Sequence, residues 1–115
     1  MPLDALPGDP FDALGDPNRR AIVELLRGGD RSVSELTEAL GNRISRPAVS
    51  RHLRLLKEAG LVADRAAGRR RLYAVDPAGL EALRAYLEGM WGQALADYRR
   101  AAEGGTGPTE QEGER

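Results

Sequence analysis

Apolar residues recur with helical spacing in several stretches of the chain, and capping residues or glycines separate these stretches. A short helical turn over residues 11–14 is expected first. A helix should then start at Asp16-Pro17, where an aspartate N-cap precedes proline at the first helical position, and end at Gly28-Gly29. The buried stripe of this helix is expected to contain Ala21, Ile22, Leu25 and Leu26.

The next two predicted helices form a pair. The shorter one is expected to begin at Ser34 and to stop at Gly41; the longer one is capped by Ser45, carries Pro47 in its first turn and ends before Gly60. A short helix, a tight turn and a longer capped helix follow one another in a helix-turn-helix. The inward-facing positions are Leu36 and Leu40 in the shorter helix and Val49, Leu53 and Leu56 in the longer one.

After Gly60 the hydrophobic period changes to that of strands. Residues 61–65 and 70–75 are predicted to pair as a hairpin through a loop at 66–69, and Asp76-Pro77 starts a final long helix. The sequence thus predicts a mostly α fold with a small β-hairpin wing. Residues 1–10 are expected to be a flexible arm, residues 11–100 a single domain and residues 101–115 a disordered tail.

Charge is distributed very unevenly along the chain. Residues 43–71 hold nine basic and two acidic side chains, a balance of +7, and since the whole chain carries −1, the rest carries −8. Because binding to nucleic acid depends on the local field, this segment is a candidate DNA surface. The recognition helix, about residues 46–59, would enter the major groove, while the arginines of the wing would contact the backbone or the minor groove. The candidate DNA-binding residues are Ser45, Arg46, Pro47, Ser50, Arg51, His52, Arg54, Arg69, Arg70 and Arg71.

Two plainer interpretations of these charges stay open, namely a solvated basic helix face and an ordinary charged loop. His52 lies at the edge of the apolar stripe and would be half-buried beside the core. Arg51 or Arg54 is the candidate for a guanine edge, because the planar guanidinium fork matches the two acceptors of that base.

Three motifs, in this order, resemble one family. Residues 11–22 (FDALGDPNRRAI) are similar to the opening helix of ArsR-type regulators, residues 46–62 (RPAVSRHLRLLKEAGLV) to their recognition helix, and residues 68–73 (GRRRLY) to their wing. The resemblance covers about residues 10–98 and implies a winged helix-turn-helix repressor of transcription, with its own operon as one candidate target. The turn at residues 41–44 is about one residue longer than usual in the family.

The last helix carries more apolar surface than a domain of this size can cover. The resemblance implies a homodimer through the first and last helices that reads a palindromic operator in double-stranded DNA. The alternative is that the stripe closes the core of its own subunit. The candidate interface residues are Phe11, Leu14, Leu83, Leu87, Met90, Trp91 and Leu95.

Composition argues against several other classes of function. The chain has no cysteine and one histidine, and the last helix offers Glu81, Glu88 and Asp97 without a histidine, so neither a metal site nor another cofactor is expected. No catalytic motif points to an enzyme. No apolar run predicts a membrane span and no secretory signal is evident, so a cytoplasmic location is expected. A MarR-like or PadR-like regulator and a winged-helix protein-interaction module without DNA stay as alternatives, and a small-molecule effector remains unknown.

Overall fold

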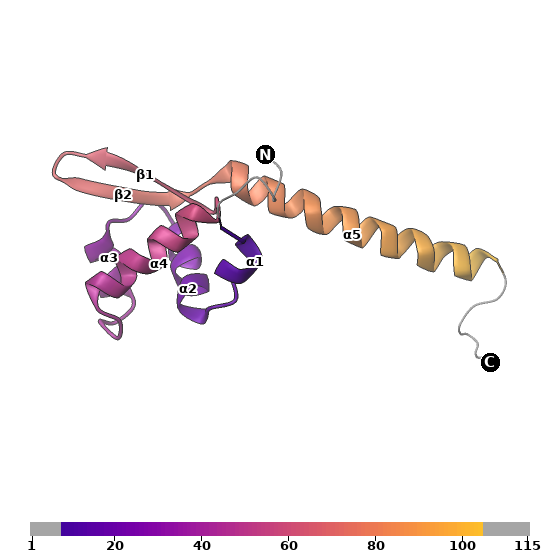
Figure 1. Ribbon diagram of the computed structural model, residues 1–115, viewed down its shortest axis with the longest axis horizontal. Coiled ribbons are helices and arrows are strands. Elements are labelled where there is room, and N and C mark those ends of the chain that lie inside the picture. The colour runs from indigo at the N-terminus through magenta and orange to yellow at the C-terminus, as the bar shows by residue number, and fades with distance from the viewer. Residues whose placement is uncertain (1–7, 105–115) are drawn as a thin grey trace. The chain divides into compact units, whose positions relative to one another are not determined.

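A computed structural model describes residues 8–104 of the chain (Figure 1). The residues up to Leu83 form one compact unit, and the part of the chain from Arg84 onward forms a second. The elements are α1 (Pro10–Ala13), α2 (Pro17–Arg27), α3 (Val33–Ala39), α4 (Arg46–Glu58), β1 (Val62–Ala67), β2 (Arg70–Val75) and α5 (Pro77–Glu103). The predicted fold class, mostly α with one hairpin, is confirmed.

Most of the predicted helix boundaries are confirmed by the capping bonds. The Oδ1 of Asp16 accepts the backbone N–H of Asn18 at 2.7 Å, and the Oδ1 of Asp76 accepts that of Ala78 at 3.0 Å. The Oγ of Ser45 caps α4 in the same way, accepting from Ala48 at 3.2 Å. These side chains satisfy backbone donors that a helix leaves unpaired in its first turn, which is why the sequence located the helix starts correctly.

The predicted start of α3 at Ser34 is wrong by one residue, because the helix begins at Val33 and Ser32 is its N-cap. The Oγ of Ser32 accepts the backbone N–H of Glu35 at 3.2 Å, and the Glu35 carboxylate accepts the backbone N–H of Ser32 at 2.8 Å. This reciprocal capping box needs Glu three residues after Ser, a spacing that Ser32 has and Ser34 lacks.

The wing has a tighter turn than predicted. The β1–β2 register runs from Val62↔Val75 to Ala67↔Arg70, so the loop contains two residues, Gly68 and Arg69, instead of four. Gly68 has φ +65°, a left-handed conformation that glycine adopts at no steric cost and that suits a two-residue hairpin. At the other edge, Arg31 exchanges two backbone hydrogen bonds with Tyr73, of 3.0 and 2.8 Å, which ties the wing to the α2–α3 connection.

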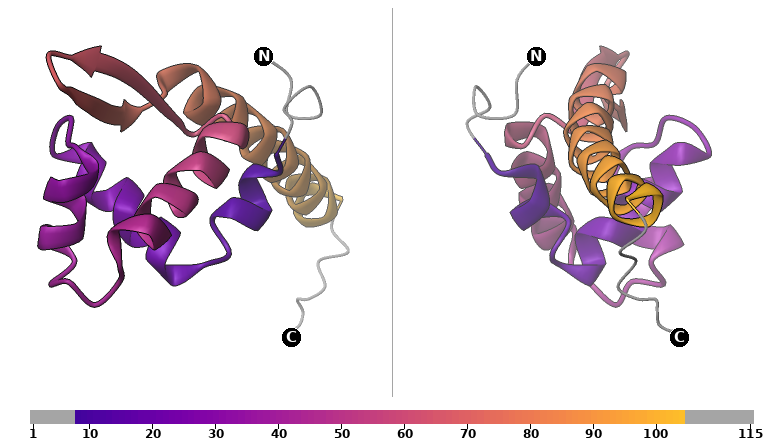
Figure 2. Two further views of the ribbon diagram at one scale, coloured as in Figure 1. Left: turned by 60° about the vertical axis from the view of Figure 1, so that its left-hand side comes forward. Right: turned by 90° about the vertical axis from the view of Figure 1, so that its right-hand side faces the viewer.

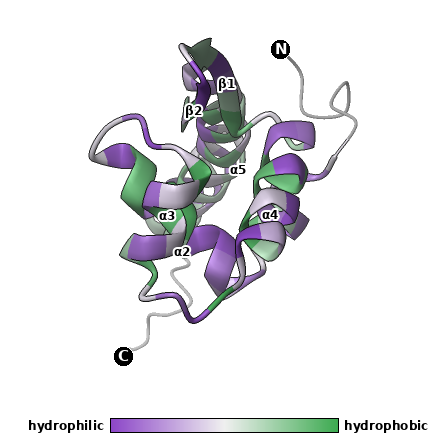
Figure 3. Ribbon diagram, turned by 90° about the vertical axis from the view of Figure 1, so that its left-hand side faces the viewer, coloured by the Kyte–Doolittle hydropathy of each residue, from purple (hydrophilic) through white to green (hydrophobic). Residues whose placement is uncertain are grey.

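The hydrophobic core lies among α1, α2, α3 and α4 and the start of the wing, and the left view of Figure 2 shows α2, α3 and α4 next to one another. Hydrophilic and hydrophobic positions alternate along α3 and α4 in Figure 3, as expected for helices that bury one face. The core residues are Ala13, Ile22, Leu26, Leu36, Leu40, Val49, Leu53, Leu56, Ala59, Leu61 and Val62.

The last helix is longer than predicted and largely exposed. It continues to Glu103, so residues 101–103 are helical, contrary to the expected tail from 101 onward; residues 105–115 lie outside the described part of the chain. The expected N-terminal arm also falls mostly outside it, although Gly8 donates its backbone N–H to the carbonyl of Glu58 at 2.9 Å and α1 already begins at Pro10. Within residues 8–104, no helix is both long and apolar enough to cross a membrane.

Candidate nucleic-acid interface

Nine of the ten candidate DNA-binding side chains are exposed, and they come from α4 with its N-cap and from the tip of the wing. All of them belong to the unit that ends at Leu83. The exposed set is Ser45, Arg46, Pro47, Ser50, Arg51, Arg54, Arg69, Arg70 and Arg71.

The recognition helix separates its faces as its sequence predicted. Val49 and Leu53 are fully buried, whereas Arg51 and Arg54 lie on the exposed side. No salt bridge among the described residues involves Arg46, Arg51 or Arg54. Their donors are therefore available to acceptors outside the subunit, and α4 presents them with Pro47 in its first turn and the Ser45 cap beside them.

His52 differs from the other nine, because it is buried, with 7% of its surface exposed. Its Nδ1 lies 3.4 Å from Nη1 of Arg19, whose Nε donates to the carbonyl of Ala13 at 2.7 Å. As Arg19 can only donate, Nδ1 must be the acceptor of a neutral imidazole. Burial lowers the pKa of His52, Asp16 raises it, and Arg19 and Arg51 lower it further, with a net fall below 6.5. His52 thus joins α4 to the α1–α2 region.

A carboxylate near the base of the wing joins the recognition helix to the hairpin. Asp64 of β1 accepts from Nζ of Lys57 at 2.7 Å and from Nη1 of Arg71 at 3.1 Å, and only 10% of its side chain is exposed. The hydrogen bond from Lys57 is the largest cause that lowers the pKa of Asp64; burial opposes it, and the charges of Lys57 and Arg71 add to the lowering. The charged form of Asp64 therefore favours the folded arrangement of α4 and the wing.

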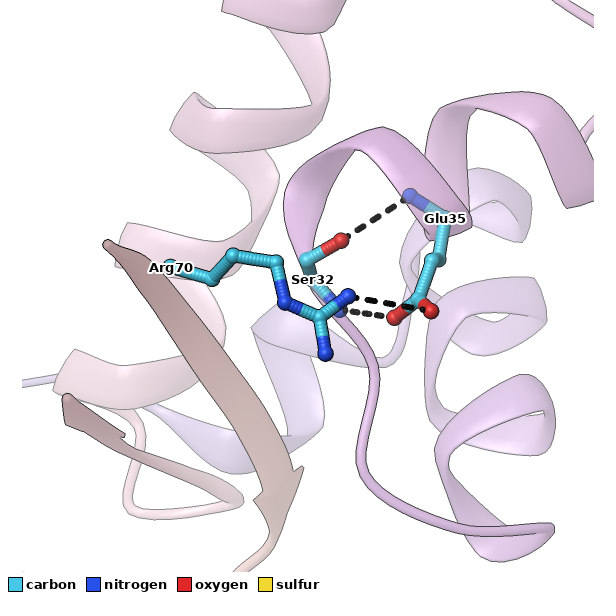
Figure 4. Close-up of polar contacts among 3 residues, drawn as sticks. All are labelled: Ser32, Glu35 and Arg70. Atoms are coloured by element: carbon cyan, nitrogen blue, oxygen red, sulfur yellow. Dashed lines mark hydrogen bonds and ion pairs between the residues drawn. The ribbon is translucent and has the colours of Figure 1, made fainter. Parts of the chain in front are cut away.

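A second carboxylate contacts the tip of the wing. Arg70 donates from Nη1 to Oε2 of Glu35 at 3.3 Å, while Glu35 keeps its capping bond to Ser32, as Figure 4 shows. The bond from the Ser32 backbone lowers the pKa of Glu35 most, burial opposes it, and Arg70 lowers it further. A hollow of about 340 Å³ lies at this point. Its lining residues are Ser32, Val33, Ser34, Glu35, Arg46, Arg69, Arg70 and Arg71.

Sequence reasoning missed both carboxylates. Glu35 and Arg70 are 35 positions apart, and Lys57 and Asp64 lie on different elements. No periodicity relates such pairs, so their contacts depend on the tertiary fold. The capping box of Glu35 was the one local signal available.

The predicted dimer residues fall into two groups. Leu14 and Leu83 are half-buried and pack against the core of their own subunit, and Phe11 is exposed. On α5, the exposed fractions are 47% for Leu87, 57% for Met90, 68% for Trp91 and 41% for Leu95. These four residues, the α5 apolar stripe, stand at positions i, i+3, i+4 and i+8, the pattern of one helix face.

No group of three or more His, Asp or Glu side chains in residues 8–104 is arranged to hold a metal ion. The site consists of exposed cations, two carboxylates that partly pair with them, and small polar side chains. An exposed basic face on the second helix of a helix-turn-helix, followed by an arginine-tipped hairpin, defines a winged helix-turn-helix regulator of transcription.

Comparisons with known proteins agree with this class. Residues 16–64 match the family model described as "Bacterial regulatory protein, arsR family". The chain is 52% identical over 92 residues to the HTH-type transcriptional regulator Rv2034 of Mycobacterium tuberculosis, covering 80% of this chain and 84% of that protein. It is 37% identical over 71 residues to the transcriptional repressor SdpR of Bacillus subtilis, covering 62% and 77%.

A solved structure gives the same result. The fold is similar, with a TM-score of 0.58 and 31% identity, to the solution NMR structure of the homodimeric winged helix-turn-helix DNA-binding domain Mb0332 from Mycobacterium bovis, covering 76% of this chain and 75% of that one. The chain belongs to the ArsR family of bacterial transcriptional regulators. This membership confirms the resemblance of the three motifs and decides against the MarR-like and PadR-like alternatives.

Proposed function

We propose that the protein is a homodimeric repressor that binds a palindromic operator in double-stranded DNA. The observation that carries the proposal is the set of exposed arginines on α4 and the wing, of which Arg46, Arg51, Arg54 and Arg69 form no salt bridge within residues 8–104. Such cations are expected to release counterions from DNA phosphates on binding, which supplies most of the affinity that does not depend on sequence.

In this proposal α4 lies in the major groove and supplies the sequence preference. Arg51 or Arg54 forks onto the O6 and N7 of a guanine, and Ser50 bonds a base edge or a phosphate. The wing arginines contact the backbone or the adjacent minor groove. His52 takes no part in direct contact because it is buried, and its bond with Arg19 holds α4 on the subunit.

The α5 apolar stripe forms the homodimer interface in this proposal. Large apolar side chains exposed together on one helix face are typical of an interaction surface, and tryptophan is enriched at such contacts. The similar domain Mb0332 is described as homodimeric. Two recognition helices related by a two-fold axis would read the two halves of a palindrome.

The regulation we propose does not use a metal ion. The chain has no cysteine, and the carboxylates of α5 lack a histidine partner.

We also place the protein in the cytoplasm, where its DNA target is, and propose that it represses transcription, as the name of the similar protein SdpR says of that protein. Nothing in the site resembles catalytic machinery, so we propose no enzymatic activity.

The experiment compares Arg51→Ala and Arg54→Ala with wild type on a duplex selected from a random pool and on its scrambled version. If one of these arginines reads guanine, its variant should lose about 1–3 kcal/mol of binding free energy on the selected duplex and discriminate less at one position. Arg69→Ala should instead weaken binding to both duplexes about equally.

Arg27→Ala is the matched control, because it removes the same charge from α2, where Arg27 pairs with Glu24. It should bind like the wild type. If wild type enriches no duplex from the random pool, the interpretation as a protein-interaction module replaces this proposal. If Arg69→Ala changes the sequence preference while Arg51→Ala and Arg54→Ala do not, the roles assigned to α4 and the wing are reversed.

A further inference from the structure

The hollow between α3 and the wing has an unbalanced set of charges. Four arginines line it (Arg46, Arg69, Arg70 and Arg71), and Glu35 is its one lining carboxylate. Arg71 is paired outside the hollow, with Asp64, and Arg70 is paired with Glu35 itself. Four guanidinium groups around one carboxylate leave a local excess of positive charge, which an anion from outside the subunit would neutralise.

The two oxygens of Glu35 have different tasks. Oε1 accepts the backbone N–H of Ser32 at 2.8 Å and so completes the cap of α3, whereas Oε2 accepts from Arg70 at 3.3 Å (Figure 4). The first bond belongs to the helix and is local. The second joins two half-exposed side chains, a kind of ion pair whose net contribution in water is small. Oε2 can therefore lose its partner while α3 stays capped.

A DNA phosphate is a better partner for Arg70 than Glu35 is in one respect. A phosphate offers two free oxygens for parallel N–H bonds from the guanidinium, whereas Glu35 offers Arg70 only Oε2, because its Oε1 accepts from Ser32. The neighbouring Arg46 and Arg69, which form no salt bridge within the described chain, would share the same anion. The wing must approach the backbone for the proposed function to hold, and the hollow lies at its tip.

We propose that this hollow takes a backbone phosphate of the bound DNA, and that the phosphate displaces the Oε2 of Glu35 from Arg70. Glu35 is an internal competitor that occupies Arg70 in the free protein and weakens its contribution to DNA affinity. The inference rests on the proposed function, and it adds a phosphate site and a residue that opposes DNA binding.

A consequence for salt dependence follows. Each phosphate contact to B-DNA contributes about 0.9 to the slope of log affinity against log salt, because a counterion is released. When Arg70 leaves Glu35, the freed carboxylate attracts a cation from solution and offsets part of that release. Removing the charge of Glu35 should therefore make the slope steeper.

The test is Glu35→Gln, which removes the charge and keeps an oxygen that can accept the Ser32 N–H, since glutamine also completes a capping box. We expect this variant to bind both the selected and the scrambled duplex roughly two- to fivefold more tightly, the range of an exposed ion pair. Its salt slope should be steeper by up to about 0.9. Glu38→Gln is the matched control, with the same charge change one turn further along α3, outside the lining of the hollow.

A double-mutant cycle assigns the effect to Arg70. In an Arg70→Gln background, Glu35→Gln should give no further gain, because the competition has lost its target. Arg70→Gln alone should also cost less affinity than Arg69→Gln, since Arg70 must first give up Glu35. This comparison needs no folded Glu35 variant, so it tests the proposal even if Glu35→Gln unfolds.

The proposal is overturned if Glu35→Gln binds no more tightly than wild type, or if the gain equals that of Glu38→Gln or persists without Arg70. It is also overturned if Arg70→Gln costs as much as Arg69→Gln or more. In each of these cases wild type still binds DNA and the proposed function stands. If wild type and Glu38→Gln bind neither duplex, the proposed function fails as well.

Discussion

The α5 apolar stripe allows a quantitative prediction about self-association. Burying a whole leucine contributes about 1.5–3 kcal/mol, and 47% of Leu87 is exposed in the isolated subunit. About half of that free energy is thus available to an interface. Each subunit of a two-fold symmetric dimer contributes one Leu87, so the dimer gains this free energy twice. Leu87→Glu should cost the dimer about 1.5–3 kcal/mol before any cost of burying the new charge. This corresponds to a dissociation constant raised at least about tenfold.

Trp91 should contribute more to the interface than Leu87. Its side chain is larger and 68% exposed, so Trp91→Glu should cost more than Leu87→Glu. The double variant should raise the dissociation constant at least about a hundredfold. Ala85→Glu is the matched control, because Ala85 is exposed on the face of α5 opposite the stripe and should leave the dimer intact.

Sedimentation velocity at tens of micromolar protein is the assay. Wild type and Ala85→Glu should sediment as dimers and the double variant as a monomer. A wild-type monomer at this concentration, or a double variant that stays dimeric, would refute the assignment of the interface to this stripe. In that case the stripe would have to be covered in some other way.

Four further outcomes are expected. Asp64→Asn should lower the free energy of unfolding in urea by roughly 1–3 kcal/mol, because its two cationic partners lose a charged acceptor; an unchanged midpoint would show that the bridge is unimportant. Because the pKa of His52 is lowered on folding, the free energy of unfolding should be highest above about pH 6.5 and should decline as the pH falls below that value. His52→Gln should remove the part of this decline that comes from His52; an equal decline in both proteins would contradict the prediction. Gly79→Ala should destabilise by roughly 1–3 kcal/mol or more, since the new Cβ would lie 1.5 Å from the carbonyl oxygen of Gly60, and normal stability would contradict that contact. Zinc, cadmium or arsenite should leave DNA affinity unchanged, and a stoichiometric metal that releases DNA would overturn the metal-independent proposal.

The parts of the fold that were predictable from sequence have local causes. Asp16-Pro17 and Ser45 mark helix starts through bonds within three residues, and the left-handed Gly60 after α4 needs no tertiary contact. The start of α3 also has a local cause, because Glu35 stands three residues after Ser32 and completes a capping box with it, which Ser34 cannot form. The expected start at Ser34 is therefore wrong for a local reason and not because of a tertiary contact.

Other features depend on contacts between distant parts of the chain. The wing strands extend to Ala67 and Arg70 because cross-strand pairing continues to the tip, which alternation alone did not indicate. Exposure of the α4 arginines followed from helical periodicity, whereas the ion pairs of Glu35 and Asp64 depend on how α3, α4 and the hairpin pack. The burial of His52 beside Arg19 has the same origin.

The central claim is that exposed arginines on α4 and the wing bind DNA phosphates while α4 reads sequence. The most direct measurement is the affinity of the wild-type protein for the selected duplex and its scrambled version between 50 and 200 mM salt. With roughly 6–10 phosphate contacts per dimer, affinity should fall about 10³–10⁵-fold over this range on the selected duplex, which should stay the preferred one throughout. An affinity that is insensitive to salt, or equal for the two duplexes, would contradict the account.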